Sequence, residues 1–180
     1  MCIRDRNNTI VWGTWSTRNL ECASLDGSSA SSTVLVNKNF SISDVELDLD
    51  NGFVYYGNGS GQDAAERGLY RAGYSGGCGA LSDGLLVPDA TRVYGITFDL
   101  PGSLVYWTSP DANDVSLANL DGTGVVNNFC SGGNPPGSWI NGLDLLNGTL
   151  YWNAFGSDRT YSSPASACNV TTYNLSLIHI

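Results

Sequence analysis

The chain has 180 residues, a formal net charge of −9 at pH 7 and a sequence pI near 4.2. Only 8 residues are Lys or Arg, which excludes a protein that binds nucleic acid or an anionic membrane surface mainly by charge. Hydrophobic residues make up 42%, and no apolar run reaches the roughly 20 residues that a bilayer requires. The composition therefore predicts a folded domain without a transmembrane segment or direct membrane contact.

The first and last six residues are expected not to belong to the natural protein. The opening Met-Cys-Ile-Arg-Asp-Arg can be encoded by a DNA word whose reverse complement encodes Leu-Ser-Leu-Ile-His, the start of the final six residues. One word read on opposite strands thus accounts for both ends, as expected for a sequencing adapter. We therefore assign residues 1–6 and 175–180 to adapter artefacts and residues 7–174 to the natural segment. This segment has no histidine, because the only one is His179.

Within residues 7–174 the chain repeats a bulky ring at a regular interval. The recurring rings are Trp12, Tyr56, Trp107 and Trp152, which are 44, 51 and 45 residues apart. An Asp precedes the last three rings by eight residues, and a second Asp follows the first and third rings by 14 residues. The preceding residues are Asp48, Asp99 and Asp144, and the following ones are Asp26 and Asp121. Two markers in one phase predict an internal repeat of about 45 residues.

Each repeat is expected to form a four-stranded antiparallel sheet. In the third repeat, apolar and aromatic runs at 93–99, 104–108, 115–120 and 125–129 alternate with Pro-Gly and Asp-Gly turns. Four short strands in about 45 residues are typical of one blade of a β-propeller. We predict an all-β, incomplete β-propeller with two whole blades, 39–89 and 90–136, and two partial blades, 7–38 and 137–174.

The rings and the recurring Asp residues have expected structural roles. Adjacent residues of a strand point to opposite faces, so a Tyr-Trp pair can anchor both faces of a blade, and each buried ring removes about 150–250 Å² from water. The predicted inter-blade aromatics are Trp12, Tyr56, Tyr106, Trp107, Tyr151 and Trp152. An Asp at a hairpin can cap the turn backbone, which is the role predicted for Asp48, Asp99, Asp144, Asp26 and Asp121.

The third repeat resembles the YWTD repeats of the low-density lipoprotein receptor family. Tyr106-Trp107-Thr108 matches the first three letters of that motif, and Leu120-Asp121-Gly122 matches the Leu-Asp-Gly that follows it. The resemblance implies a non-enzymatic, extracellular receptor propeller that binds protein or lipoprotein ligands. The ligand-binding residues are unknown, but the loops at one end of the disc, such as 57–66, 109–114 and 131–138, are expected to form the binding face.

No catalytic constellation is visible in the natural segment. Without histidine, Ser-His-Asp and Cys-His arrangements are excluded. Oxygen ligands for calcium could come from Asp48 with Asp50, or from Asp111 with Asn113 and Asp114. We expect no enzyme activity, no cofactor and no catalytic or metal-binding residue. The alternatives are a lactonase or hydrolase whose calcium site is completed by missing blades, and a structural repeat of a large surface adhesion protein.

Cysteines and glycosylation sequons favour an extracellular or cell-surface location, with any membrane anchor outside this segment. No Cys-x-x-Cys motif occurs, so the disulfide candidates, in any of three pairings, are Cys22, Cys78, Cys130 and Cys168. The candidate glycosylation sites are Asn7, Asn39, Asn58, Asn147 and Asn169.

Overall fold

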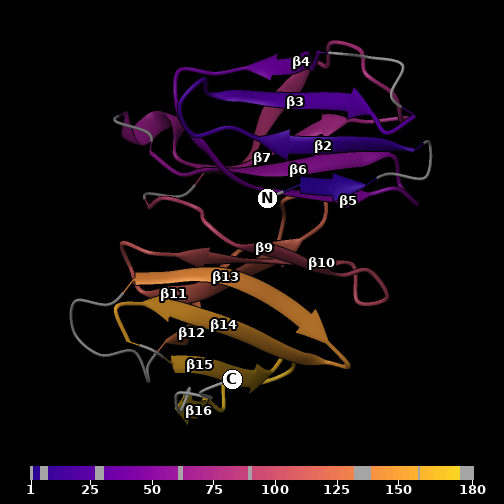
Figure 1. Cartoon of the computed structure of the whole chain (residues 1–180). Coiled ribbons are helices and arrows are strands. Elements are labelled where there is room, and N and C mark those ends of the chain that lie inside the picture. Colours follow the sequence, from indigo (N-terminus) through magenta and orange to yellow (C-terminus); the bar gives the residue numbers. More distant parts are fainter. Residues whose placement is uncertain are drawn as a thin grey trace, which may run out of the picture. The chain divides into compact units, whose positions relative to one another are not determined.

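A computed structural model of the chain describes residues 2–4, 8–26, 31–60, 63–88, 91–131, 139–157 and 159–174. In these ranges the regular elements are β-strands and one short 3₁₀ helix, η1 (Ala64–Glu66), so no helix there could cross a membrane. The strands form four antiparallel sheets of four strands, and in each sheet the strands lie in chain order (Figure 1). The predicted all-β fold, an incomplete β-propeller of four-stranded blades, is confirmed.

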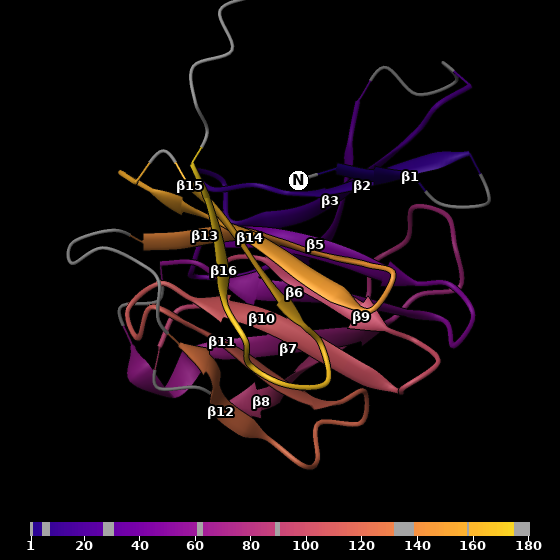
Figure 2. The same ribbon diagram turned by 90° about the horizontal axis from the view of Figure 1, so that it is seen from below.

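The strands of the four sheets follow one another along the sequence. The first sheet contains β1 (Cys2–Arg4), β2 (Thr9–Gly13), β3 (Asn19–Ser24) and β4 (Thr33–Asn37). The second contains β5 (Ile42–Asp48), β6 (Phe53–Asn58), β7 (Gly68–Gly73) and β8 (Asp83–Pro88). The third contains β9 (Ile96–Asp99), β10 (Leu104–Ser109), β11 (Asp114–Asn119) and β12 (Val126–Ser131). The fourth contains β13 (Trp139–Leu146), β14 (Thr149–Phe155), β15 (Arg159–Pro164) and β16 (Thr171–Asn174), orange to yellow in Figure 2.

The two sheets that were expected to be partial also have four strands. The fourth sheet completes itself with β16, which pairs with β15. The first sheet obtains its edge strand from residues 2–4, which pair with β2 from Cys2 opposite Trp12 to Arg4 opposite Ile10. The sequence predicts that these residues come from an adapter, and in the structure they occupy the place of the first strand of the sheet.

The chain divides at Val93 into two compact units, residues 1–93 and 94–180. The first unit holds the first and second sheets, and the second unit holds the third and fourth. In each unit the first strand of the later sheet packs on the earlier sheet, because β5 contacts β1 and β2, while β13 contacts β9 and β10. Both units therefore use the same sheet-to-sheet contact.

The core of each unit lies between its two sheets and follows the alternation of side chains along a strand. Val11 and Tyr106, each directly before a recurring ring, belong to the core shared with the following sheet. Tyr56 and Trp152, the recurring rings themselves, belong to the core shared with the preceding sheet. Within a unit, the residue before the ring of the earlier sheet thus contacts the later sheet, and the recurring ring of the later sheet contacts the earlier one.

Glycine allows the backbones of the third and fourth sheets to approach closely. A Cβ atom on Gly95 would lie 2.5 Å from the carbonyl oxygen of Asn141 and 2.6 Å from the backbone nitrogen of Leu143. Thr108 reinforces this contact, since its Oγ1 accepts from the backbone nitrogen of Gly95 and donates to the Asn141 carbonyl, both at 2.7 Å. The third letter of the Tyr-Trp-Thr motif therefore joins two sheets.

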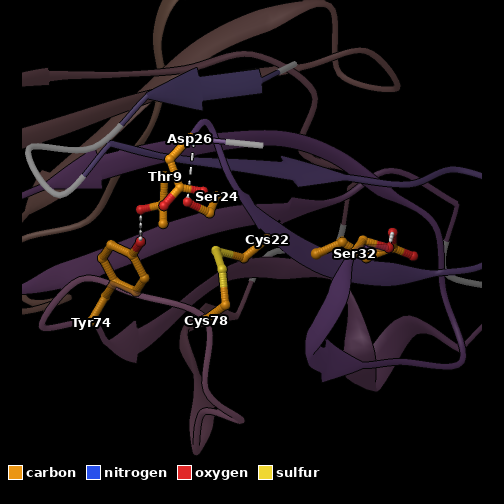
Figure 3. Close-up of a disulfide and its surroundings, with 8 residues drawn as sticks. Thr9, Cys22, Ser24, Asp26, Ser32, Tyr74 and Cys78 are labelled. Carbon is orange, nitrogen blue, oxygen red and sulfur yellow. Dashed lines mark hydrogen bonds between the residues drawn. A yellow bond between two sulfur atoms is a disulfide. The ribbon is translucent and has the colours of Figure 1, made fainter. Parts of the chain in front are cut away.

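One disulfide also joins the two sheets of each unit. Cys22 of β3 is bonded to Cys78 in the β7–β8 loop, and Cys130 of β12 is bonded to Cys168 in the β15–β16 loop. Of the three pairings that the sequence leaves open, the structure forms the one that keeps each bond within a unit. Figure 3 shows the Cys22–Cys78 bond near the 3.3 Å hydrogen bond between the hydroxyls of Thr9 and Tyr74, which links the same two sheets.

Candidate binding surface

Strand direction separates two kinds of connection in every sheet. Because neighbouring strands are antiparallel, the turns after the first and third strands lie at one end of the sheet. The loops after the second strand and the linkers between sheets lie at the opposite end, which we call the linker end. The predicted ligand-binding loops 57–66, 109–114 and 131–138 all belong to linker ends, although residues 61–62 and 132–138 lie outside the described part of the chain.

At the end opposite the linkers, three of the predicted turn caps are formed. The carboxylate of Asp48 accepts from the backbone nitrogen and from Nδ2 of Asn51, at 3.1 and 2.7 Å. Asp99 Oδ1 accepts from the backbone nitrogen of Gly102 at 3.2 Å, and Asp121 Oδ1 accepts from that of Thr123 at 2.9 Å. These carboxylates are engaged in their turns. Among the described residues, no group of three or more His, Cys, Asp or Glu side chains is placed to hold a metal ion.

Asp144 does not cap a turn, which corrects the sequence prediction. Asn147 and Gly148 have φ angles of 51° and 73°, the left-handed values of a two-residue type I′ turn, and Leu146 pairs directly with Thr149. The strand therefore continues two residues past Asp144, whose carboxylate accepts from the adjacent backbone nitrogen of Leu145 at 2.8 Å. For Asp26, residues 27–30 lie outside the described ranges, so its capping role stays a prediction.

The linker end of the first unit carries an exposed tryptophan. Trp15 follows β2 and is 52% exposed. Its carbonyl oxygen accepts from Ser41 Oγ, in the linker to the second sheet, at 2.7 Å. Its ring lies so close to the β6–β7 loop that a Cβ atom on Gly59 would be 2.8 Å from Cζ3. Trp15 is thus held by two neighbouring connections while half of its surface stays in solvent.

Polar contacts tie together the three connections at this linker end. Arg18, in the β2–β3 loop, donates from Nη1 to the carbonyl oxygen of Asn39 at 2.8 Å. Asn39, in the β4–β5 linker, donates from Nδ2 to Oε1 of Glu66 at 2.7 Å. Glu66 belongs to η1, whose first turn is capped by Asp63 through a 2.9 Å bond from the backbone nitrogen of Ala65. These contacts connect the described residues of the three connections around Trp15.

A largely buried ion pair joins the same linker to the second sheet. Lys38 Nζ lies 2.5 Å from Oδ2 of Asp83, and the side chains are only 19% and 12% exposed. Tyr56 donates its hydroxyl to the same carboxylate. Lys38 Nζ also lies 4.6 Å from the ring centroid of Tyr70, which stacks on Tyr56 with 5.3 Å between centroids. This network fixes the junction between the two sheets.

Burial controls the ionisation of these phenols. Burial, assisted by the hydrogen bond to Asp83 and its charge, raises the pKa of Tyr56 far above its ordinary value of 10. Burial, with the charges of Glu66 and Asp83 adding to it, raises the pKa of Tyr70 to about 12. Burial likewise raises the pKa of Tyr106, with a smaller contribution from Asp99. Both Tyr56 and Tyr70 therefore keep their hydroxyl protons to a higher pH than a free phenol does.

The predicted inter-blade aromatics fall into two groups. Four of them have exposed fractions of 0–3%: Tyr56, Tyr106, Trp107 and Trp152. Trp12 is partly exposed and Tyr151 is 37% exposed, so the prediction that they fill a wedge between sheets is wrong for this chain. Each of these two rings points away from the other sheet of its unit.

The candidate glycosylation sites also differ in accessibility. Asn58 is fully buried, its Nδ2 donates to the carbonyl oxygen of Glu66 at 2.7 Å, and its Oδ1 accepts from the backbone nitrogen of Ser60. A glycan on that nitrogen is incompatible with the fold, which corrects the prediction for Asn58. Asn147 and Asn169 are exposed, Asn39 is exposed but bonded to Glu66, and Asn7 lies outside the described residues.

Solved structures resemble this chain, whereas no protein-family model and no curated protein sequence matches it. A putative gluconolactonase has a TM-score of 0.72 at 16% identity, over 98% of this chain and 63% of that chain. Virginiamycin B lyase from Staphylococcus aureus has a TM-score of 0.71 at 17% identity, over 98% of this chain and 55% of that one. Nidogen, from a nidogen/laminin complex, has a TM-score of 0.58 at 14% identity, over 94% of this chain and 76% of that one.

Identities this low establish the propeller fold alone. The chain spans 55–76% of the length of these three structures. Trp15, the exposed ring at the linker end, is absent from the candidate residues identified in the sequence. The sequence feature that could have identified Trp15 is its position, three residues after Trp12 and past the end of the apolar run.

Proposed function

We propose that the chain is part of an extracellular, non-enzymatic propeller that binds a protein ligand at the linker end of its first unit. The observation that carries this proposal is Trp15, which is 52% exposed although two neighbouring connections hold its backbone and ring. A tryptophan on ordered loops is a common anchor of protein interfaces, because it offers a large contact area at little cost in conformational entropy.

Two further observations support the extracellular part of the proposal. The structure forms two disulfides, and such bonds persist mainly in oxidising compartments. Nidogen, one of the structural neighbours, is found in a complex with laminin, so a propeller of this general shape accompanies a protein ligand in that case. The Tyr106-Trp107-Thr108 motif extends the proposal to a divergent relative of the lipoprotein-receptor propellers, with lipoprotein as a second ligand class.

Binding of laminin and of low-density lipoprotein to the immobilised chain, measured by surface plasmon resonance, tests the proposal. We expect at least one of these two probes to bind, and the Trp15→Ala variant to bind it roughly 30-fold more weakly, as for the loss of about 2 kcal/mol at an interface anchor. Val126→Ala serves as the control, because Val126 is 46% exposed on β12, a strand of the second unit. Binding of neither probe, or equal binding by wild type and Trp15→Ala, would overturn the proposal.

The enzymatic alternative is motivated by the putative gluconolactonase and the lyase among the neighbours. It requires a calcium site built from carboxylates, so titration of the chain with calcium by isothermal calorimetry addresses it directly. Saturable calcium binding together with turnover of a lactone would favour the alternative over the binding platform.

A further inference from the structure

We propose that two copies of this chain associate head to tail, with the open face of the fourth sheet of one copy packing on the open face of the first sheet of the other. The open face of a sheet is the face that points away from the other sheet of its unit. The two faces differ, and each unit already contains the contact that would join them.

Equivalent residues of the repeat show which side chains another sheet covers inside a unit. In the earlier sheet of each unit, the residue before the recurring ring contacts the later sheet, and these residues, Val11 and Tyr106, are at most 1% exposed. The fourth copy of that residue, Tyr151, is 37% exposed. In the later sheet of each unit, the recurring ring contacts the earlier sheet and is buried, as in Tyr56 and Trp152, whereas the first copy, Trp12, is partly exposed.

The open face of the fourth sheet is strongly apolar. Opposite residues of an antiparallel pair share a face, and the pairs Trp139–Phe155 and Leu146–Thr149 flank Tyr151 on the same side. Trp139, Phe155 and Leu146 are 51%, 68% and 60% exposed, and the Trp139 and Phe155 rings stack with 6.4 Å between centroids. Tyr173 joins this face through its pairing with Thr160, and it is 47% exposed. Contiguous exposed apolar surface of this kind marks an interaction site.

The open face of the first sheet has the complementary half of the contact. Trp12 lies opposite Glu21, which lies opposite Val34, and Ile10 lies opposite Ala23 on the same side. Val34 is 43% exposed, and the other apolar side chains of this face are partly exposed. The Glu21 carboxylate accepts hydrogen bonds from Asn19 Nδ2 and Ser32 Oγ, at 3.1 and 2.8 Å. Both carboxylate oxygens of Glu21 are therefore hydrogen-bonded, one from β3 and one from the β3–β4 loop.

A second copy fits these faces because it supplies the partner that each face lacks: a recurring ring for Tyr151, and a residue before the ring for Trp12. Within the second unit, Tyr106 shares a core with Trp152, and within the first unit Val11 shares a core with Tyr56. If Tyr151 of one copy packs in a shared core with Trp12 of another copy, the two residues repeat this arrangement. Since the two faces are different, the contact is heterologous, and a pair of copies leaves one face of each kind open for further addition.

Sedimentation velocity of the oxidised full chain tests the proposal. We expect the wild type to form species larger than a monomer as its concentration rises. Tyr151→Arg and Val34→Arg each place a charge on one open face, at side chains exposed enough to leave the fold intact, so each variant alone should be monomeric. An equimolar mixture retains one intact face of each kind and should form a 1:1 dimer that does not grow. Phe155→Arg should behave like Tyr151→Arg.

The control is Val125→Arg, because Val125 is 41% exposed and lies outside the first and fourth sheets, so this variant should associate like the wild type. A monomeric wild type at high concentration would overturn the proposal and would leave the fourth sheet to another occupant, such as a further blade. Association of Val34→Arg alone would show that the fourth sheets pair with each other. A mixture of the two variants that stays monomeric would equally contradict the proposed contact.

Discussion

Asp48 and Asp144 occupy the same place in the repeat, eight residues before the recurring ring, yet only Asp48 closes a turn. Asp48 is fully buried at the end of β5 and accepts two hydrogen bonds from Asn51. Asp144 lies within β13, opposite Tyr151, and is exposed. The same residue type therefore has two energetic roles, which a pair of matched substitutions separates.

We expect Asp48→Ala to lower the free energy of unfolding by about 1–2 kcal/mol, because it leaves the donors of Asn51 without their acceptor. Asp144→Ala should change it by less than about 0.5 kcal/mol, as for an ordinary surface substitution. Urea denaturation of the two variants and the wild type measures both effects. Similar losses for the two variants would contradict the assignment of Asp48 as a turn cap and Asp144 as a strand residue.

The buried phenols predict a loss of stability at alkaline pH. Burial raises the pKa of Tyr70 to about 12 from an ordinary value of 10, so the unfolded chain releases this proton at a lower pH than the folded chain does. The stabilising contribution is complete below pH 10 and is lost as the pH rises through 12. Urea denaturation across this window should show a falling free energy of unfolding, and the fall should be shallower in Tyr70→Phe. An identical slope in both proteins would contradict this account.

At the scale of the element, the strands were predictable from local sequence because alternation and turn dipeptides are local signals. The third repeat illustrates this, since the runs at 104–108 and 115–120 correspond to β10 (Leu104–Ser109) and β11 (Asp114–Asn119). Asn-Gly, however, occurs before the recurring ring in both the second and fourth repeats and forms different turns. Leu146 stands where the second repeat has Asp50, and this apolar residue extends the strand up to the turn.

Contacts between elements could not be read from the sequence in the same way. The pairing of Cys22 with Cys78 depends on which loop of the second sheet reaches β3, and spacing along the chain does not contain that information. The burial of a recurring ring likewise depends on whether a sheet lies against its face. Trp12 and Trp152 have the same place in the motif, but only Trp152 has a preceding sheet in its own unit, and it is 3% exposed.

At the scale of the whole molecule, the two units have separate cores and separate covalent links. The first core consists of residues of the first unit, and the second core consists of residues of the second unit. Each disulfide connects the two sheets of one unit, with sequence separations of 56 and 38 residues. In the chain-entropy description, bonds that close loops of this length each stabilise the folded state by about 4 kcal/mol.

This division predicts that removing one disulfide weakens one unit and spares the other. In Cys22→Ala/Cys78→Ala, backbone amides of β2 to β8 should exchange with deuterium faster than in the wild type, while those of β9 to β16 stay protected. In Cys130→Ala/Cys168→Ala the pattern should reverse, because that bond lies in the second unit. Hydrogen exchange followed by mass spectrometry of peptides resolves the two regions. Equal loss of protection across the whole chain in either variant would show that the units unfold together, and that the disulfides act on one cooperative structure.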